Sequence, residues 1–549
     1  MCFWIVLFWY LRYVPVPLSQ LAALAFPVSV VLLVLLALRN RSVPVSCGRH
    51  DLLVLVVLVV LLVLRFKAMA SVIAPAGADM SMHTYVAALI SMADGIPGSY
   101  EPLVPIETFS TFPVGFHVLT AIISLTGNME VYRAGLLMTC MTYFLLTLFS
   151  YALLRNWLGR AGALAASVLV SYFFHDPGSF ITWGGIPTVL AIGMVLLFLT
   201  FKESNDLSPS VSIMGASLTL AGILLIHTII FVQVFYLLFI TLPVYYWQRG
   251  RLRRGEIKAF VSLALLFFCL TLPYILNIDF GVLTPGTLDL MKNWVRNTDH
   301  AWHGNYKNAF WSIPVYIARR LGYHYIIAIF VIAGLAWIKK GFWRNNREII
   351  IACTVYVLSA IVLIVNTRYW LLPFSFAIYP ERVVAMLIIP FALLCGLALD
   401  HLSRDDVRFR LQRFLPASLA VILVLMAVTR YNFTHFEAPL IRESSVTRDD
   451  LRGLLWLREN TKTADVVRNN YGDAGVWIPA IAMRPATAAH VNFAYLDKTR
   501  PLPDPRYVFV GSKCVYQPCS ITAFTMAADP AFREVFHSGE TFVYERRGR

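Results

Sequence analysis

The chain has 549 residues, of which 58% are hydrophobic and only 14% carry a charged side chain. A soluble protein would carry about 25% charged residues, so this composition excludes a soluble protein and indicates a polytopic membrane protein. Lys and Arg number 46 against 31 Asp and Glu, a formal net charge of +15. Basic residues of membrane proteins gather in cytoplasmic loops. Because the chain has no basic patch interleaved with aromatic residues, we expect no nucleic-acid partner.

Apolar segments long enough to cross a bilayer recur over the first 430 residues. The predicted spans are 18–38, 51–70, 131–154, 161–174, 188–201, two within 211–247, 259–277, 323–338, 349–365, 383–399 and 415–428. They make about twelve transmembrane helices, or about thirteen if the apolar run 2–14 also crosses. The first forty residues lack a charged start and a small-residue cleavage site, so we interpret them as an uncleaved anchor.

Basic clusters after alternate spans predict one orientation. Four strongly basic loops fall on the cytoplasmic side, which places the loops 71–130 and 278–322 outside. The apolar segment 111–126 would flip every later basic loop if it crossed the membrane. We therefore predict a re-entrant or surface-lying helix there.

The last 120 residues or so differ in pattern from the rest. We predict a transmembrane module over 1–430 and a soluble, extracytoplasmic α/β domain over 431–549. Segment 449–461 has helical spacing, and four segments are typical of short strands; these segments are 464–470, 486–493, 507–512 and 541–545. Cys514 and Cys519 either form a disulfide there or remain free thiols.

Ionisable residues are concentrated in the predicted outer loops. Asp79 and His83 open the first loop four residues apart, so a helix would place both on one face. Polar groups at membrane depth are functional candidates, and a site between helices would gather them from separate loops. The further candidates in these loops and turns are His175, Asp176, Trp183, His227, Arg319, Arg320, Glu381 and Arg382.

Each candidate also has a structural interpretation. Asp79 could be a solvated helix cap, His83 an interfacial residue and His227 a polar residue at a membrane end. Arg382 could reach the lipid phosphates. Its position on the outer face nevertheless opposes the positive-inside bias, and a guanidinium suits a specific anion. The chain lacks a Walker loop, a GxGxxG motif after a strand, a CxxC and an HExxH, which leaves ATP-driven transport, dinucleotide chemistry and zincin proteolysis without support.

Four segments resemble the GT-C superfamily of membrane glycosyltransferases, which take sugars from polyprenyl-phosphate carriers. They are GADMSMHTYVAAL at 77–89, FPVGFHVLTAI at 112–122, WGGIPTVLA at 183–191 and YPERVVAML at 379–387. The likeness covers most of the chain in layout and is strongest to uncharacterised prokaryotic members. It implies a GT-C-like helical fold and a catalytic or metal-binding role for the acid of the first outer loop, here Asp79.

The resemblance also implies how the remaining candidates would act. His175 and Asp176 stand where the superfamily has a second acidic motif, so Asp79, His175 and Asp176 are the candidate ligands of a divalent Mg or Mn ion. One carboxylate would take the acceptor's proton, and cations would hold the developing phosphate charge. We assign Asp79 to the first task. The candidates for substrate and phosphate binding are Arg382, Arg319, Arg320, His83, His227, Trp183 and Glu381.

We therefore predict a multi-pass glycosyltransferase of the plasma membrane. It would move a sugar from a polyprenyl-phosphate donor to a glycan, lipid or protein acceptor on the extracytoplasmic face, with the lipid bilayer as a partner. The alternatives are a non-catalytic GT-C-like scaffold and a transporter or flippase of lipid-linked or polar solutes. A transporter would need ionisable groups in the middle of its spans, and the long apolar runs hold few.

Overall fold

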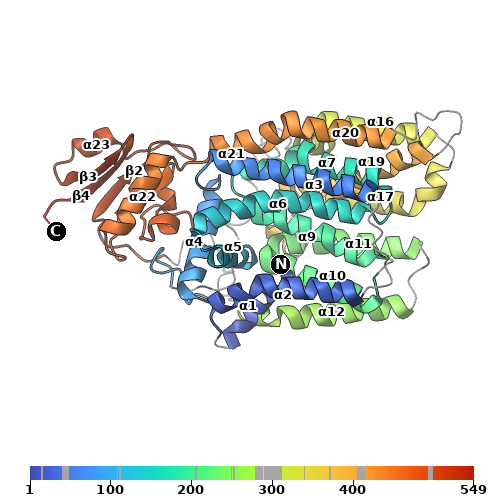
Figure 1. The fold of residues 1–549 in the computed structure, drawn as a ribbon, viewed down its shortest axis with the longest axis horizontal. Helices are drawn as coiled ribbons and strands as arrows, with labels where there is room; N and C mark the ends of the chain where they lie inside the picture. Colours follow the sequence, from blue (N-terminus) through green and yellow to red (C-terminus); the bar gives the residue numbers. More distant parts are fainter. Residues whose placement is uncertain are drawn as a thin grey trace.

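The structure is a computed structural model, in which a helical bundle carries a small sheet-containing domain at one end (Figure 1). It describes residues 1–13, 16–39, 49–107, 109, 113–204, 207–248, 250, 254–278, 289, 293, 312–338, 341–369, 372–404, 415–491 and 499–548. Most of the predicted loop 278–322 therefore lies outside the described residues.

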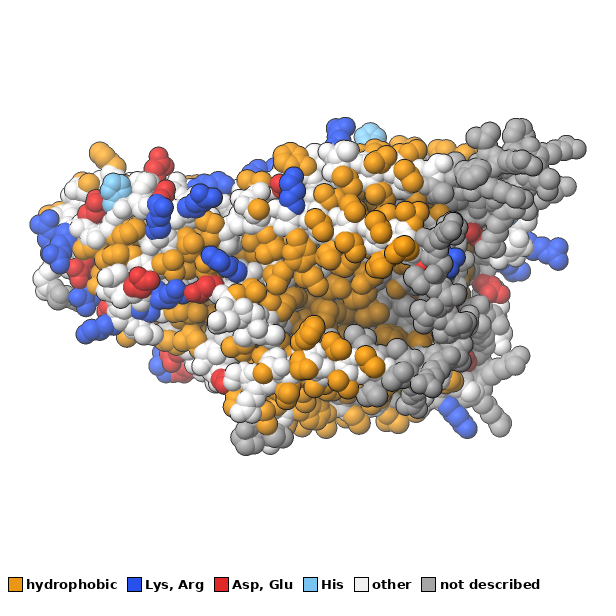
Figure 2. Space-filling model, viewed as in Figure 1, with side chains coloured by type: hydrophobic (Ala, Val, Ile, Leu, Met, Phe, Trp, Pro, Cys, Tyr) orange, Lys and Arg blue, Asp and Glu red, His pale blue; other side chains and the backbone are white. Residues whose placement is uncertain are grey.

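The bundle is built from apolar helices that run roughly along its length (Figure 1). They are α2 (Leu18–Arg39), α3 (Arg49–Lys67), α6 (Val131–Leu154), α7 (Arg160–Val168), α9 (Ile186–Glu203), α10 (Pro209–Ile226), α11 (Thr228–Gln248), α12 (Arg254–Ile275), α16 (Tyr323–Ile338), α17 (Phe342–Tyr369), α18 (Pro380–Met386), α19 (Ile388–Arg404) and α20 (Leu415–Met426). Figure 2 shows the broad hydrophobic surface that these helices present. A continuous apolar belt of this kind is what a bilayer covers.

Among the described residues, eight helices are long and apolar enough to cross a membrane, and two bent pairs raise the number to ten. This confirms a polytopic helical membrane protein. The twelve predicted spans each coincide with a helix, but two of them are not among these ten. The predicted span 18–38 is counted only over the apolar part Leu18–Leu32 of α2, and the predicted span 161–174 corresponds to the short apolar helix Arg160–Phe173. The difference between the twelve predicted spans and the ten counted in the structure comes from these two segments.

Two short helices do not cross the bundle. Helix α1 (Cys2–Tyr10) has nine residues, or about 14 Å of helix, and buries Trp4, Phe8 and Trp9. Helix α5 (Gly115–Gly127) has 13 residues, about 20 Å, against a hydrocarbon core of about 30 Å. The length of α5 agrees with the prediction that segment 111–126 is re-entrant or surface-lying.

Arg65 near the end of α3 ties three helical segments together. Its Nη2 donates to the Ser171 carbonyl at 2.7 Å, and its Nη1 donates to Asn432 Oδ1 at 3.1 Å. Its guanidinium also lies 3.8 Å from the centre of the Tyr172 ring. The cation is therefore buried in a structural contact between helical segments.

The C-terminal domain is a four-stranded sheet with helices beside it (Figure 1). Its strands are β1 (Val467–Arg468), β2 (Tyr507–Val510), β3 (Phe532–Ser538) and β4 (Thr541–Arg546) in the order β1-β2-β4-β3, and its helices are α22 (Arg448–Asn460) and α23 (Ala523–Ala527). β1 pairs parallel to β2, and the other pairs are antiparallel. Thr447 begins α22 with a capping box to Asp450, which is the helix predicted at 449–461.

The predicted strand 486–493 is wrong over its described part. Only Ala486 forms a bridge, to Val467, and the chain then turns through Thr487 and Ala488. Side-chain bonds from Asn469 to both backbone groups of Ala488 replace strand pairing there. The last two residues of the segment lie outside the described residues.

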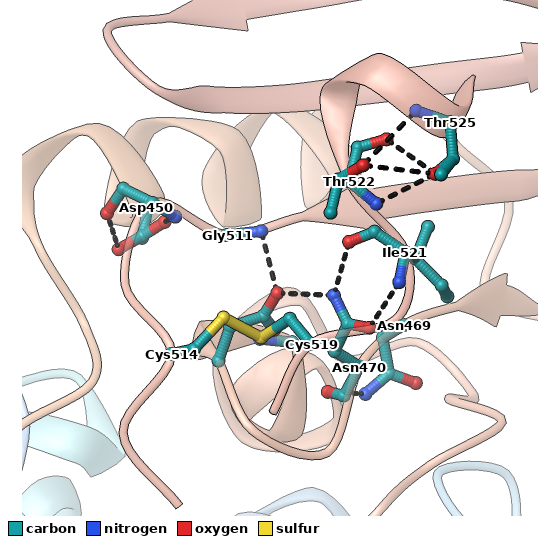
Figure 3. The surroundings of a disulfide bond; sticks show 12 residues. Asp450, Asn469, Asn470, Gly511, Cys514, Cys519, Ile521, Thr522 and Thr525 are labelled. Atoms are coloured by element: carbon teal, nitrogen blue, oxygen red, sulfur yellow. Dashed lines mark hydrogen bonds between the residues drawn. A yellow bond between two sulfur atoms is a disulfide. The ribbon is translucent and has the colours of Figure 1, made fainter. Parts of the chain in front are cut away.

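Cys514 and Cys519 form a disulfide in the loop between β2 and α23 (Figure 3). The same loop is tied to the segment after β1 by Asn470. The amide of Asn470 donates to the Ile521 carbonyl at 2.8 Å and accepts from the Ile521 N–H at 2.9 Å. The disulfide therefore closes a loop that supports the chain next to Tyr471.

Candidate functional site

The site lies at the start of α4 (Ala78–Ala93), which follows the N-cap residue Gly77. Gly77 has φ +88°, and a Cβ built there would come 2.2 Å from the backbone nitrogen of Gly184. The Asp79 N–H donates to the Trp183 carbonyl at 3.2 Å. A glycine is therefore required for the 183–185 loop to pack against the helix start. This packing places Asp79 in the first turn of α4, beside Trp183.

Asp79 contacts a residue far away in the sequence. His490 Nε2 lies 2.9 Å from Asp79 Oδ1, and His490 Nδ1 is hydrogen-bonded to the Tyr471 hydroxyl. Burial acts to raise the pKa of Asp79, but the hydrogen bond and charge interaction with His490, together with weaker effects of His83 and Arg382, bring it below its usual value. Asp79 is therefore a carboxylate at neutral pH.

A histidine pair lies behind Asp79. His83 Nδ1 is 2.9 Å from His117 Nε2, and both side chains are buried. Burial lowers the pKa of His83 to about 4, against an opposing effect of the nearby Asp79 charge. His83 is thus neutral at pH 7. The sequence predicts that Asp79 and His83 share one face of a helix. The electrostatic interaction between the two side chains agrees with this prediction.

Arg382 faces this group from the first turn of α18. Its guanidinium lies 4.3 Å from the centre of the Tyr379 ring and 5.7 Å from that of Trp183. Its Nε and Nη1 atoms are buried and make no hydrogen bond within the part of the chain that the structure describes. A guanidinium with two buried, open donors, flanked by aromatic rings, suits an anion such as a phosphate.

Two more predicted residues lie beside Arg382. His227, at the junction of α10 and α11, interacts electrostatically with Arg382 and His83, and its Nδ1 accepts the Ile230 N–H at 3.4 Å. Glu381 is the chain neighbour of Arg382 in the first turn of α18. The fold therefore gathers Asp79, His83, Trp183, His227, Glu381 and Arg382 from four separate segments.

Other predicted residues are engaged elsewhere. Arg320 Nε lies 2.7 Å from Oδ2 of the fully buried Asp176, and Ser179 also donates to that carboxylate. The helix that carries Arg320, α15 (Ser312–Leu321), is bent by 101° from α16 at Gly322. The side chain of Arg319 is exposed on this helix. Arg320 thus balances Asp176.

The predicted metal ligands do not form a cation site. Within the described ranges, no group of three or more His, Cys, Asp or Glu side chains is arranged to hold a metal ion. Asp79 is bound by His490, and Asp176 is bound by Arg320, while His175 lies in electrostatic contact with Arg320. A resident Mg or Mn ion prefers several oxygen ligands, so the donor set of Asp79, His175 and Asp176 does not fit one.

His490, Tyr471 and Tyr379 are site residues that the sequence did not identify. His490 lies in an apolar segment that was interpreted as a strand, and Tyr471 follows two asparagines with no motif around it. Tyr379 belongs to the segment YPERVVAML, in which only the charged residues stood out. An ionisable residue within an apolar stretch of a soluble domain was the one available signal for His490.

The fold of the chain is similar to that of solved GT-C membrane proteins. The apo structure of ArnT from Cupriavidus metallidurans matches with a TM-score of 0.54 at 12% identity, over 90% of this chain and 98% of that chain. The same protein bound to undecaprenyl phosphate matches with a TM-score of 0.53 at 12% identity, over the same shares of both chains. The arabinofuranosyltransferase AftD from Mycobacteria matches with a TM-score of 0.55 at 12% identity, over 90% of this chain and 40% of that chain.

Residues 9–504 match the family of unknown function DUF6541, so the chain belongs to that family. A comparison with curated proteins found no match. The structural likeness therefore establishes the GT-C fold, and the family assignment adds no activity to it.

Proposed function

We propose that this protein is a glycosyltransferase that moves a sugar from a polyprenyl-phosphate donor to an acceptor hydroxyl. The observation that carries the proposal is the guanidinium of Arg382, whose buried Nε and Nη1 atoms lack hydrogen-bond partners in the described structure, within electrostatic reach of the Asp79 carboxylate. A cation of this kind can bind an anion, and a carboxylate can accept the proton of an attacking hydroxyl. A phosphate leaving group and an acceptor hydroxyl require this combination.

The reaction needs little from the protein beyond these groups. The acceptor oxygen forms a bond to the anomeric carbon, and the bond from that carbon to the phosphate oxygen breaks. The bonding electrons leave with the phosphate, whose charge Arg382 stabilises. The acceptor's proton passes to Asp79. Trp183 and Tyr379, which flank Arg382, would hold the sugar or the phosphate end of the donor between them.

The proposed orientation follows from which charged residues lie at each end of the bundle. Glu130 at the start of α6 pairs with Arg458 of the C-terminal domain at 3.0 Å. Arg155 and Arg160 follow the other end of this 24-residue helix, about 36 Å away. The positive-inside rule assigns the arginine end to the cytoplasm. We therefore place the Asp79 group and the C-terminal domain on the extracytoplasmic face of the plasma membrane.

Binding and turnover of a radiolabelled panel of polyprenyl-phosphate sugars by the purified protein test this function. We expect transfer or hydrolysis by the wild type and none by Asp79→Asn. Asp94→Asn is the matched control, since Asp94 ends the same helix and accepts hydrogen bonds from Ser19 outside the site. Equal turnover by Asp79→Asn would contradict the proposal, and binding without turnover would favour the scaffold alternative.

A further inference from the structure

The residues that hold Asp79 come from the C-terminal domain and not from the bundle. Tyr471 follows β1, and His490 follows the turn after Ala486. Asp79 belongs to α4, the first helix after the α3 span. The contact between His490 and Asp79 therefore closes the candidate site across the boundary between bundle and domain.

Both residues are fixed by hydrogen bonds within the domain. Asn469 accepts the Ala488 N–H at 2.9 Å and donates to the Ala488 carbonyl at 3.1 Å, which holds the chain two residues before His490. Asn470 binds both backbone groups of Ile521 next to the disulfide loop, as Figure 3 shows. The two asparagines thus fix the segments that carry Tyr471 and His490.

The arrangement selects one tautomer of His490. Burial raises the pKa of the Tyr471 hydroxyl, and the Asp79 charge raises it further, so the hydroxyl keeps its proton. When the imidazole is neutral, a Tyr471 hydroxyl that donates to Nδ1 of His490 leaves the ring proton on Nε2. That N–H then donates to Oδ1 of Asp79 at 2.9 Å. His490 thus holds Oδ1 of the Asp79 carboxylate. We assign the other oxygen, Oδ2, as the atom that accepts the acceptor's proton.

We propose that His490 and Tyr471 are positioning residues for Asp79, so that the C-terminal domain completes the active site of the GT-C bundle. This inference rests on the proposed function. In the transfer step the acceptor's proton goes to Asp79 Oδ2, while His490 and Tyr471 keep their protons. Their contribution is to hold the carboxylate in one orientation, and a misplaced catalytic group costs rate more than binding.

The test measures kcat and the KM for the donor in three single variants. His490→Leu removes the N–H donor, and we expect kcat to fall about ten- to a hundredfold with the donor KM within about twofold of the wild type. His490→Gln retains an N–H group at a similar reach, and we expect it to recover most of that rate. Tyr471→Phe removes only the hydroxyl, and we expect kcat to fall about three- to tenfold.

A double variant separates positioning from packing. In the His490→Gln background, Tyr471→Phe should cost no further rate, because glutamine has no tautomer to select. A purely structural role for Tyr471 predicts the same loss in both backgrounds, and that result would overturn the inference. If His490→Leu fails to fold, Tyr471→Phe and His490→Gln still decide the matter.

The two proposals fail in different ways. Wild-type rates in all three variants, beside an inactive Asp79→Asn, would overturn the role of His490 and Tyr471 and leave the proposed function standing. No turnover by the wild type on any donor would overturn the proposed function, and the positioning role with it.

Discussion

Arg320 lies against the fully buried carboxylate of Asp176, with Nε 2.7 Å from Oδ2. The pair joins α15, which lies across the end of the bundle, to α8 (His175–Gly178). Sequence interpretation assigned Asp176 to a metal and Arg320 to a phosphate. The pairing gives each residue an electrostatic partner within the protein, whereas we propose the phosphate-binding role for Arg382.

We expect Arg320→Leu to destabilise the protein by about 3 kcal/mol, because it leaves the Asp176 carboxylate buried without its cation. Asp176→Asn combined with Arg320→Leu should recover part of this loss, since no buried charge then remains. Thermal unfolding in detergent measures both effects. Arg319→Leu, which removes the exposed neighbour, is the control and should leave Tm nearly unchanged; equal losses for Arg319 and Arg320 would contradict the prediction.

Arg382→Met should weaken binding of a polyprenyl phosphate about ten- to a hundredfold, because a charge-assisted hydrogen bond contributes about 1.5–3 kcal/mol. Arg382→Lys should recover only part of the affinity, since an ammonium lacks the guanidinium fork. The Kd for the sugar-free lipid phosphate is the measurement. Arg452→Met, on the exposed surface of the C-terminal domain, serves as the control. An unchanged Kd for Arg382→Met would rule out this phosphate contact.

Gly77→Ala should abolish turnover and lower stability by about 2 kcal/mol or more. The added Cβ would need to occupy space 2.2 Å from the backbone of Gly184, at a φ of +88° that alanine disfavours. The start of α4, and Asp79 with it, would have to move. Gly98→Ala is the matched control, because a Cβ there meets nothing within 4 Å. Activity and Tm of the two variants, measured side by side, check the prediction.

His83 predicts how stability depends on pH. Its pKa in the folded protein is about 4, whereas in an unfolded chain it is about 6.5. Between these values the unfolded chain binds a proton that the folded protein does not. Stability should therefore fall as the pH drops from about 7 to about 4, by about 3 kcal/mol at most for this residue.

Tm of the wild type and of His83→Gln across this pH range provides the measurement. The slope should be shallower in His83→Gln, which has no titrating ring. His537→Gln, which replaces an exposed side chain of strand β3, is the control and should keep the slope of the wild type. Identical slopes for the wild type and His83→Gln would show that His83 does not contribute to the pH dependence.

Local sequence patterns determined the class of this protein. Long apolar runs predicted the spans, and short segments rich in β-branched and aromatic residues predicted β2 and β4. Asp79 was identified by its place in the first polar stretch after an apolar run. Strand β3 was not predicted, since its residues are mostly exposed or half-buried and alternate poorly.

Only the tertiary structure decided which charged residues share the site. Arg320 and Arg382 have the same side chain and both follow polar loops, yet one faces Asp176 and the other lies near Asp79 with two donors that lack hydrogen-bond partners in the described residues. His490 joins Asp79 through the packing of the C-terminal domain on the bundle. Such contacts depend on how distant segments pack, and the periodicity of a single segment holds no information about its distant partners.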